Sequence, residues 1–152
     1  MKIALIGATG LLGRECLQTL PGPLIALERR QVDLTSPASI VAALGAIRPD
    51  AVVNAAGYTR VDAAESDAGQ AFAVNAGGAL HLARACHAID AVLVQVSTDY
   101  VFGFDADRNT PYSESDPPGP INVYGASKLA GEHFVRAYAP RHFIVRTCGL
   151  FG

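Results

Sequence analysis

The chain carries little charge and little cysteine for its 152 residues. Charged residues make up 17% of it and the formal net charge is −2, which gives no electrostatic case for binding nucleic acid or a membrane surface. Its three cysteines, Cys16, Cys86 and Cys148, are odd in number and far apart. They indicate free thiols in a reducing compartment and not a disulfide framework. We therefore expect a cytoplasmic protein with neither nucleic acid nor membrane as a partner.

Several other signals are also missing. No apolar run approaches the length of a membrane span, and residues 1–6 read as a strand and not as an export signal. No Gly-x-Ser-x-Gly elbow supports a hydrolase. The four histidines lack metal-ligand spacing. We predict no metal ligands in the chain, while a need for a divalent ion in activity stays open.

Hydrophobic residues, by contrast, make up 50% of the chain. Short apolar runs that read as buried strands alternate with helical segments. The predicted strands are residues 3–6, 24–27, 51–55, 92–96 and 143–145, and the predicted helices are 11–20, 37–48, 65–89 and 124–138. Residues 103–122 are rich in Pro, Asp, Ser and Gly and read as a surface loop. This alternation predicts an α/β fold with a Rossmann-like, doubly wound parallel sheet, forming one domain over residues 1–152.

The third predicted helix carries two expectations of its own. Its inner face is expected to hold Phe72, Leu80, Leu82 and Ala83. Asn75 on the same helix would hold a water, brace the backbone of a site, or serve as a buried structural amide.

Three glycines follow the first strand at once. The first of them permits a tight turn, the second lets the backbone approach a pyrophosphate, and the third allows close helix–strand packing. The spacing is Gly-x-x-Gly-x-x-Gly, one residue longer at the front than the usual fingerprint. It predicts dinucleotide binding at Gly7, Thr9, Gly10, Leu11, Leu12 and Gly13.

The second strand ends in Glu28-Arg29-Arg30. A carboxylate at this place usually binds the adenosine ribose hydroxyls, whereas an arginine suits a 2′-phosphate. The sequence offers both, so NADPH is the expected cofactor with NADH open. Asp33 and Leu34 follow and are expected to frame the adenine, although Asp33 is equally a turn residue.

Ligands of such sheets bind beyond the carboxyl ends of the strands. Small residues there, Ala55, Ala56 and Gly57, would let the nicotinamide half of a cofactor lie against backbone. Thr98 is placed to hydrogen-bond a reacting oxygen. Asp99 would orient substrate hydroxyls, with a turn-forming role as its rival.

Tyr124 and Lys128 lie four residues apart and would share one face of a helix. A neighbouring ammonium lowers the pKa of a tyrosine from its ordinary value of ~10. Such a phenol exchanges a proton with a carbonyl or alcohol oxygen near neutral pH. Alone, the motif is weak evidence, since a surface helix often carries both residues by chance. Together with the glycine turn and Thr98 it makes Thr98, Tyr124 and Lys128 candidate catalytic residues, with Tyr124 and Lys128 also contacting the cofactor.

These motifs resemble the extended short-chain dehydrogenase/reductase family, and more narrowly its dTDP-4-dehydrorhamnose reductase subfamily. The similarity covers the whole chain and is carried by residues 7–13, 54–65, 97–102, 124–128, 131–132 and 146–147. It implies Thr98, Tyr124 and Lys128 as the catalytic residues and places Gly10, Leu11, Leu12, Glu28, Asp33 and Leu34 near the cofactor.

The resemblance also implies an activity, the NAD(P)H-dependent reduction of the 4-keto group of a dTDP-linked deoxysugar in dTDP-L-rhamnose synthesis. Two departures concern the substrate and not the fold. Gly103-Phe104 stands where members commonly have Asp-Gly, and Gly149 stands where an aromatic residue often contacts the sugar nucleotide.

Other readings stay open. A nucleotide-sugar epimerase or dehydratase shares the three catalytic residues, and a non-catalytic regulator resembling the methionine adenosyltransferase regulatory subunit shares the Tyr-x-x-x-Lys motif. Members of the subfamily continue into a smaller substrate-binding domain. We therefore expect this chain to be the N-terminal part of a longer protein and to turn over little substrate alone. A homodimer is one arrangement left open.

Overall fold

A five-stranded parallel sheet forms the centre of the computed structural model, which describes residues 1–151. The strands are β1 (Ile3–Ile6), β2 (Leu24–Leu27), β3 (Ala51–Asn54), β4 (Val92–Thr98) and β5 (His142–Thr147). Their order across the sheet is β2-β1-β3-β4-β5. The chain thus runs outward from β1 to β2 and returns past β1 to β3. Such a reversal opens a crevice at the carboxyl ends of β1 and β3, where ligands of open sheets bind.

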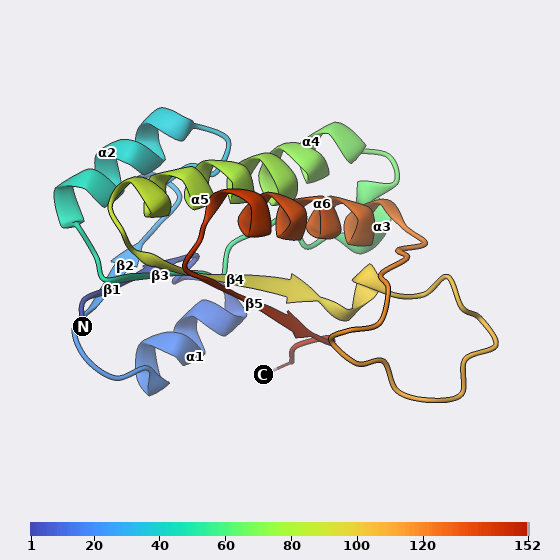
Figure 1. The fold of residues 1–152 in the computed structure, drawn as a ribbon. Helices are drawn as coiled ribbons and strands as arrows, with labels where there is room; N and C mark the ends of the chain where they lie inside the picture. Colours follow the sequence, from blue (N-terminus) through green and yellow to red (C-terminus); the bar gives the residue numbers. More distant parts are fainter. Residues whose placement is uncertain (152) are drawn as a thin grey trace.

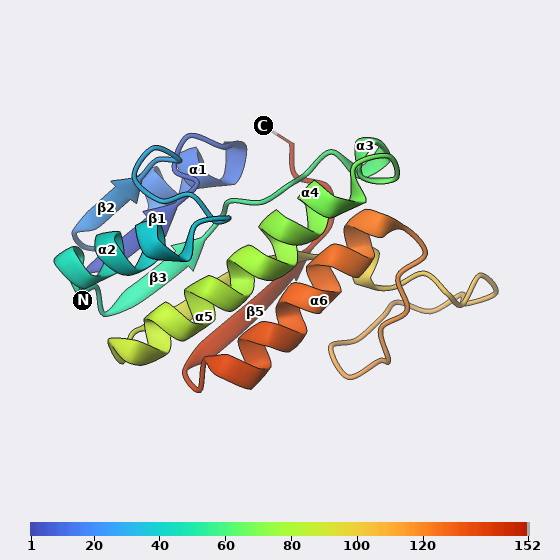
Figure 2. The ribbon, with the colours of Figure 1, turned by 90° about the horizontal axis from the view of Figure 1, so that it is seen from above.

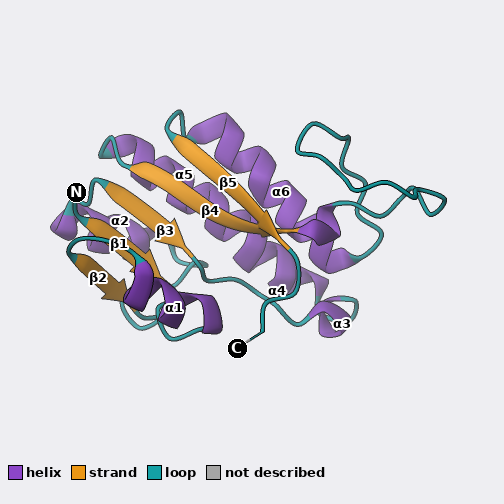
Figure 3. Ribbon diagram, turned by 90° about the horizontal axis from the view of Figure 1, so that it is seen from below, coloured by secondary structure: helices purple, strands orange, loops and turns teal. Residues whose placement is uncertain are grey.

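Helices cover the sheet on two faces. They are α1 (Leu11–Thr19), α2 (Pro37–Ile47), α3 (Val61–Ala64), α4 (Ala68–Phe72), α5 (Gly78–Ala88) and α6 (Val123–Tyr138). Helix α1 lies on one face, and α2, α5 and α6 lie together on the other (Figures 1 and 2). Figure 3 shows α1 in front of the strands and α2, α5 and α6 behind them. The predicted doubly wound parallel sheet is confirmed, and all five predicted strands are present.

The main core lies between the sheet and the helices of the larger layer. Ala4 and Ile6 of β1 and Leu93 of β4 pack there against Leu82 of α5 and Val135 of α6. Strand β1 is buried along its whole length, which explains why it reads as a continuous apolar run. The side chain of Ser36 caps α2 by accepting a bond from the Ser39 N–H, with Pro37 at the first helical position.

The segment predicted as one long helix is divided in the structure. A π-helical turn, Ala73–Gly77, lies between α4 and α5 and places the buried Asn75 against neighbouring elements. Leu82 and Ala83 are buried as predicted. The prediction for Phe72 was wrong, because its side chain is 40% exposed at the end of α4.

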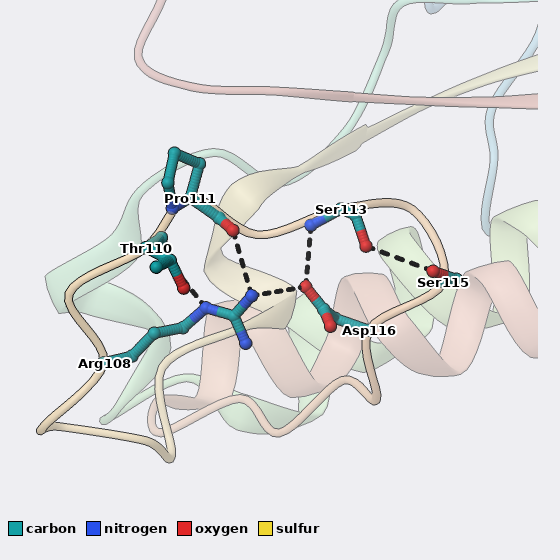
Figure 4. Close-up of polar contacts among 6 residues, drawn as sticks. All are labelled: Arg108, Thr110, Pro111, Ser113, Ser115 and Asp116. Atoms are coloured by element: carbon teal, nitrogen blue, oxygen red, sulfur yellow. Dashed lines mark hydrogen bonds and ion pairs between the residues drawn. The ribbon is translucent and has the colours of Figure 1, made fainter.

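Residues 103–122 contain no helix or strand, as predicted, apart from one isolated bridge between Gly103 and Pro120. A local network holds the loop (Figure 4). The Arg108 guanidinium donates to the Thr110 and Pro111 carbonyls, each at 2.9 Å, and to the Asp116 carboxylate at 2.7 Å. This carboxylate also accepts from the Ser113 N–H. The loop therefore has a defined course between β4 and α6.

Helix α6 approaches the π-helical turn very closely, which leads to a stability prediction. A Cβ at Gly131 would lie 2.4 Å from the Asn75 carbonyl oxygen, whereas a Cβ at Gly45 in α2 meets nothing within 4 Å. Gly131→Ala should lower the free energy of unfolding by about 1–3 kcal/mol through overpacking. Gly45→Ala should raise it by about 0.5–1 kcal/mol. Urea denaturation followed by circular dichroism measures both, and equal effects would contradict the close approach.

Candidate active site

A cavity of about 900 Å³ opens at the carboxyl ends of the strands, large enough for a dinucleotide cofactor. It is lined by segments that follow β1, β2, β3, β4 and β5 and by the start of α6. The lining includes Gly7, Thr9, Gly10, Leu11, Leu12, Arg29, Asp33, Leu34, Ala55, Ala56, Gly57, Thr98, Tyr124 and Lys128. The fold thus brings most of the predicted site residues to one cavity.

The glycine turn forms one end of this cavity. Gly7 has φ of 83°, and a Cβ there would lie 2.7 Å from the Ala56 nitrogen. Gly13 does not line the cavity but packs beneath it, since its Cβ would lie 2.1 Å from the Gly7 oxygen. Helix α1 begins after Gly10 without a side-chain cap, so its first N–H groups remain available to an anion. This end fits the pyrophosphate of a dinucleotide.

Of the two cofactor-binding residues predicted at the end of β2, only one faces the cavity. Arg29 lines the cavity. Glu28 is absent from the lining, and its carboxylate pairs with the Arg30 guanidinium at 3.0 Å. A ribose contact by Glu28 stays a prediction.

Asp33 has the turn role that the sequence left open for it, and its contact with an adenine stays a prediction. It lines the cavity, and its carboxylate accepts from the Thr35 hydroxyl at 2.7 Å and the Thr35 N–H at 2.9 Å. These two bonds hold the pKa of Asp33 below its ordinary value.

Two buried amides hold the backbone that follows β3. The Asn54 carboxamide accepts from the Ala56 N–H at 3.2 Å and donates to Gln95 at 2.9 Å. The Asn75 carboxamide accepts from the Tyr58 N–H at 2.9 Å and donates to the Tyr58 carbonyl at 3.0 Å. Asn75 therefore braces the backbone of the site, one of the roles expected from the sequence.

Asn75 also connects this backbone to α6. Its amide nitrogen donates to the Ser127 hydroxyl at 2.9 Å, and that hydroxyl donates to the Tyr124 carbonyl at 2.7 Å. The first turn of α6 is fixed from its other side as well. Asn122 accepts from the Gly125 N–H at 2.7 Å, and the Glu65 carboxylate accepts from the Val123 N–H at 2.9 Å. Tyr124 thus projects from a helix start that the side chains of Asn75, Asn122 and Glu65 hold in place.

The Tyr124 phenol is half-buried and packs edge-on against the Tyr100 ring, with centroids 5.8 Å apart. Burial raises its pKa above the ordinary value, the Thr98 hydroxyl opposes this shift, and Asp99 and Tyr100 add to it. The sequence predicted that Lys128 would lower this pKa, and that prediction was wrong, because burial raises it instead. The phenol keeps its proton near neutral pH, which suits a proton donor.

Lys128 lies one helical turn after Tyr124 and is only 8% exposed. Its ammonium donates to the Val96 carbonyl at 2.6 Å. Burial lowers the pKa of Lys128 to about 8, while the charge of Glu132 acts in the opposite direction. The side chain thus brings a cationic donor to the wall of the cavity.

Thr98 closes the arrangement at the end of β4. Its oxygen accepts from the Tyr100 N–H and its hydroxyl donates to the Asp99 carboxylate, each at 3.2 Å. Asp99 is exposed and does not line the cavity, so its contact with a substrate stays a prediction. Thr98 and Tyr124 both place a hydroxyl at one cavity, and turning the Thr98 hydroxyl away from Asp99 would give two donors for a carbonyl oxygen.

Part of the lining was not predicted from the sequence. Residues 58–61, after β3, and Gln70 and Tyr100 also face the cavity. Arg60 lies among them, with its guanidinium carbon 5.0 Å from the centre of the Tyr58 ring. The rule that ligands bind beyond strand ends would have indicated residues 58–61. Gln70 carries no such signal, since it comes from α4.

Two features are absent from the part of the chain that the structure describes. Within residues 1–151, no three His, Cys, Asp or Glu side chains are grouped so that they could hold a metal ion. No helix in the same range combines the length and apolar character needed to cross a membrane.

Comparison with known proteins gives a consistent result. The family model described as RmlD substrate binding domain matches residues 1–152. The chain is 47% identical over 150 residues to a dTDP-4-dehydrorhamnose reductase of Streptomyces griseus, covering 96% of this chain and 49% of the relative. It is 42% identical to the reductase of the same name from Mycolicibacterium smegmatis, covering 99% and 46%.

Among solved structures, the dTDP-4-dehydrorhamnose reductase of Bacillus anthracis in complex with NADP superposes with a TM-score of 0.95 at 38% identity. The match covers 99% of this chain and 54% of that one. The chain therefore spans about half the length of the curated relatives that it matches.

The environment of Lys128 predicts how stability depends on pH. Its folded pKa of about 8 lies below the ordinary 10.5, so the unfolded chain binds more protons between these two pH values. Compared with Lys128→Met, the wild-type protein should gain free energy of unfolding as the pH rises from about 8 to about 10.5. Urea titrations of both proteins across this window measure the difference. A difference that stays constant or shrinks would show that Lys128 is not buried as a charged group.

Proposed function

The chain belongs to the RmlD substrate binding domain family, and on this premise we propose that the protein containing it reduces a nucleotide-linked keto sugar with NADPH. The substrate class we propose is a dTDP-linked 4-keto-6-deoxyhexose. Relatives at 47% and 42% identity are named dTDP-4-dehydrorhamnose reductase, which supports this choice.

One observation carries the proposal. The glycine turn that fits a pyrophosphate and the three polar side chains of Thr98, Tyr124 and Lys128 line the same cavity. A dinucleotide anchored on the first N–H groups of α1 can extend along the backbone of residues 55–57 toward these side chains. The small residues there leave room for a flat ring.

The chain's own residues then have separate tasks. When bound, the reduced nicotinamide supplies a hydride to the carbonyl carbon of the sugar. Tyr124 gives its phenolic proton to the carbonyl oxygen, and the product alcohol results; the phenolate regains a proton from solvent. The Thr98 hydroxyl turns from the Asp99 carboxylate, donates a hydrogen bond to the same oxygen and polarises the carbonyl. A protonated phenol is needed for this direction, in agreement with the raised pKa of Tyr124.

Lys128 assists in two ways. Its ammonium has three N–H donors, and the Val96 carbonyl uses one of them. The remaining donors are available to the ribose hydroxyls of the cofactor. The positive charge also stabilises the phenolate that forms when Tyr124 has given up its proton.

The alternatives are less well supported. An epimerase or dehydratase needs further acid–base residues after Thr98. Here Asp99 is exposed and bonded to Thr98, while Tyr100 packs against Tyr124. A regulator without activity would share the cavity, and turnover by the complete protein separates it from a reductase.

A homodimer and a cytoplasmic location are also part of the proposal. Light scattering of the complete protein tests the homodimer.

Gly10 is the position that tests cofactor binding. A Cβ at Gly10 meets only the Gly7 oxygen, at 3.3 Å, so Gly10→Val should fold. The added side chain would occupy the place of the pyrophosphate, and NADPH binding should be lost. A cofactor fluorescence titration measures NADPH binding, and Gly45→Val in α2 is the control that should retain it. Unchanged binding in Gly10→Val would remove the glycine turn from the site.

The choice between NADPH and NADH depends on Arg29. Because Arg29 lines the cavity and Glu28 does not, Arg29→Ala should weaken NADPH by roughly 10-fold or more, in line with about 1.5–3 kcal/mol for a charge-assisted bond. NADH should bind nearly as before. Arg30→Ala is the matched control, since Arg30 pairs with Glu28 instead. An equal loss for both cofactors would contradict a 2′-phosphate contact.

Tyr124→Phe tests the chemistry. The complete protein should lose about 10²–10⁴-fold in kcat on a dTDP-4-keto sugar, because a general acid contributes that much. The cofactor dissociation constant should stay within about 3-fold, since the ring remains in place. A Tyr124→Phe enzyme at wild-type rate would refute the assigned proton donor. A wild-type protein that binds NADPH without any turnover would favour the regulator.

A further inference from the structure

Glu132 is a fully buried carboxylate to which the proposed chemistry gives no task. It lies on α6 one turn after Lys128, and none of its side chain is exposed. The Arg146 guanidinium donates to it through two nitrogens, at 2.9 and 2.7 Å. The Ser97 hydroxyl donates at 2.6 Å and Arg136 at 3.0 Å. One side chain thus joins α6, β4 and β5.

The burial of this charged side chain is energetically costly and needs a structural or functional explanation. Burial of a carboxylate costs several kcal/mol even after relaxation, and an apolar cluster of equal volume often stabilises a fold as well. Burial acts to raise the pKa of Glu132, but the bonds from Arg146, Ser97 and Arg136 outweigh it and hold the pKa below its ordinary value. The carboxylate therefore stays ionised and fully bonded. Its value lies in fixing the groups that bond to it.

The partners of Glu132 form one row of the sheet. Ser97 and Arg146 are register partners on β4 and β5, and the next pair is Thr98 and Thr147. Both members of that next pair line the cavity. Ser97 lines the cavity as well, so Glu132 fixes a residue of the cavity wall directly before Thr98. A shift of Ser97 would move Thr98, because the two are adjacent along a strand.

The same carboxylate also acts on α6. Lys128 is one turn away on this helix and bonds to the Val96 carbonyl, next to Ser97. Two bonds one turn apart therefore hold α6 on β4, from Lys128 to Val96 and from Glu132 to Ser97. Together they set the helix that carries Tyr124 against the strand that carries Thr98.

Arg146 extends the arrangement to the loop of residues 103–122. Its guanidinium lies 4.9 Å from the Phe102 ring centre. Phe102 stacks on Tyr112 with centroids 4.3 Å apart, and Arg108 lies 4.2 Å from the Tyr112 ring on the loop. Phe102 follows the 3₁₀ turn that begins at Asp99. The segment that follows Thr98 thus packs against Arg146, whose guanidinium is bonded to Glu132.

We propose that Glu132 is a positioning residue, which acts through Ser97 to set the place of the Thr98 hydroxyl relative to Tyr124. This inference rests on the proposed reductase function for its kinetic consequence. Its geometric part stands on the Glu132–Ser97 bond alone. A purely structural Glu132 would affect stability and leave the kinetics of the folded enzyme unchanged.

The kinetic test uses the complete protein with NADPH and a dTDP-4-keto sugar, well below its melting temperature. Glu132→Gln keeps the size of the side chain, and Ser97→Ala removes only the hydroxyl. Misplacement by about 1 Å costs up to ~10²-fold, so each variant should lose about 10- to 100-fold in kcat. The NADPH dissociation constant should change less than about 3-fold.

A double variant and a matched control sharpen this test. Ser97→Ala with Glu132→Gln should be no slower than Glu132→Gln alone, since residues that act through one bond are not additive. Arg136→Met removes the partner of Glu132 that is 44% exposed and should leave kcat unchanged. Additive losses in the double variant, or an unchanged kcat in both single variants, would overturn the proposal.

A second readout does not depend on turnover. The methyl resonance of Thr98, in labelled complete protein saturated with NADPH, should shift in Ser97→Ala and Glu132→Gln and stay in place in Arg136→Met. If the wild-type protein has no reductase activity while Thr98 shifts in this way, the positioning role stands and the proposed function fails. If the wild type is active and Thr98 does not shift, the function stands and the role of Glu132 is refuted. Ser97→Ala keeps the test decisive should Glu132→Gln not fold.

Discussion

Helix α6 is held on the carboxyl half of β4 by two buried side chains, and the candidate active site depends on this attachment. Lys128 bonds to the Val96 carbonyl and Glu132 bonds to the Ser97 hydroxyl. These two bonds directly join the helix that carries Tyr124 to the strand that carries Thr98. Apolar packing alone is non-directional, whereas these bonds define distance and rotation. The same attachment places a cationic side chain at the cavity wall.

The glycine turn supplies the second constraint, through close approach of backbone to backbone. Gly13 allows α1 to start against the Gly7 carbonyl, and Gly7 itself leaves no space for a side chain beside Ala56. The uncapped start of α1 and the segment after β3 are thereby brought to one cavity. In the proposed function, the residues that would bind an anion and those that would transfer a proton lie at opposite ends of that cavity. This arrangement suits a dinucleotide cofactor, which has a charged pyrophosphate and a reactive nicotinamide.

Much of this arrangement follows from local signals in the sequence. Continuous apolar runs predict the strands, because parallel strands are buried on both faces. The glycine spacing and the four-residue interval from Tyr124 to Lys128 predict the two ends of the cavity. The π-helical turn at Asn75 could not be predicted, because an i→i+5 bond leaves no periodic signal. Nor could the raised pKa of Tyr124, which depends on burial by residues distant in sequence. The sequence also could not decide whether Glu28 or Arg29 faces the cavity, because this depends on the orientation of two adjacent exposed side chains.

The most direct measurement is the transfer of deuterium from NADPH deuterated at C4 of the nicotinamide to a dTDP-4-keto sugar by the complete protein. Mass spectrometry and proton NMR of the product locate the label. Our account predicts one deuterium at C4 of the sugar, where hydride from the cofactor meets the carbonyl that Tyr124 protonates. A protein that binds NADPH in this cavity, yet yields no labelled sugar from any dTDP-4-keto hexose, would contradict it.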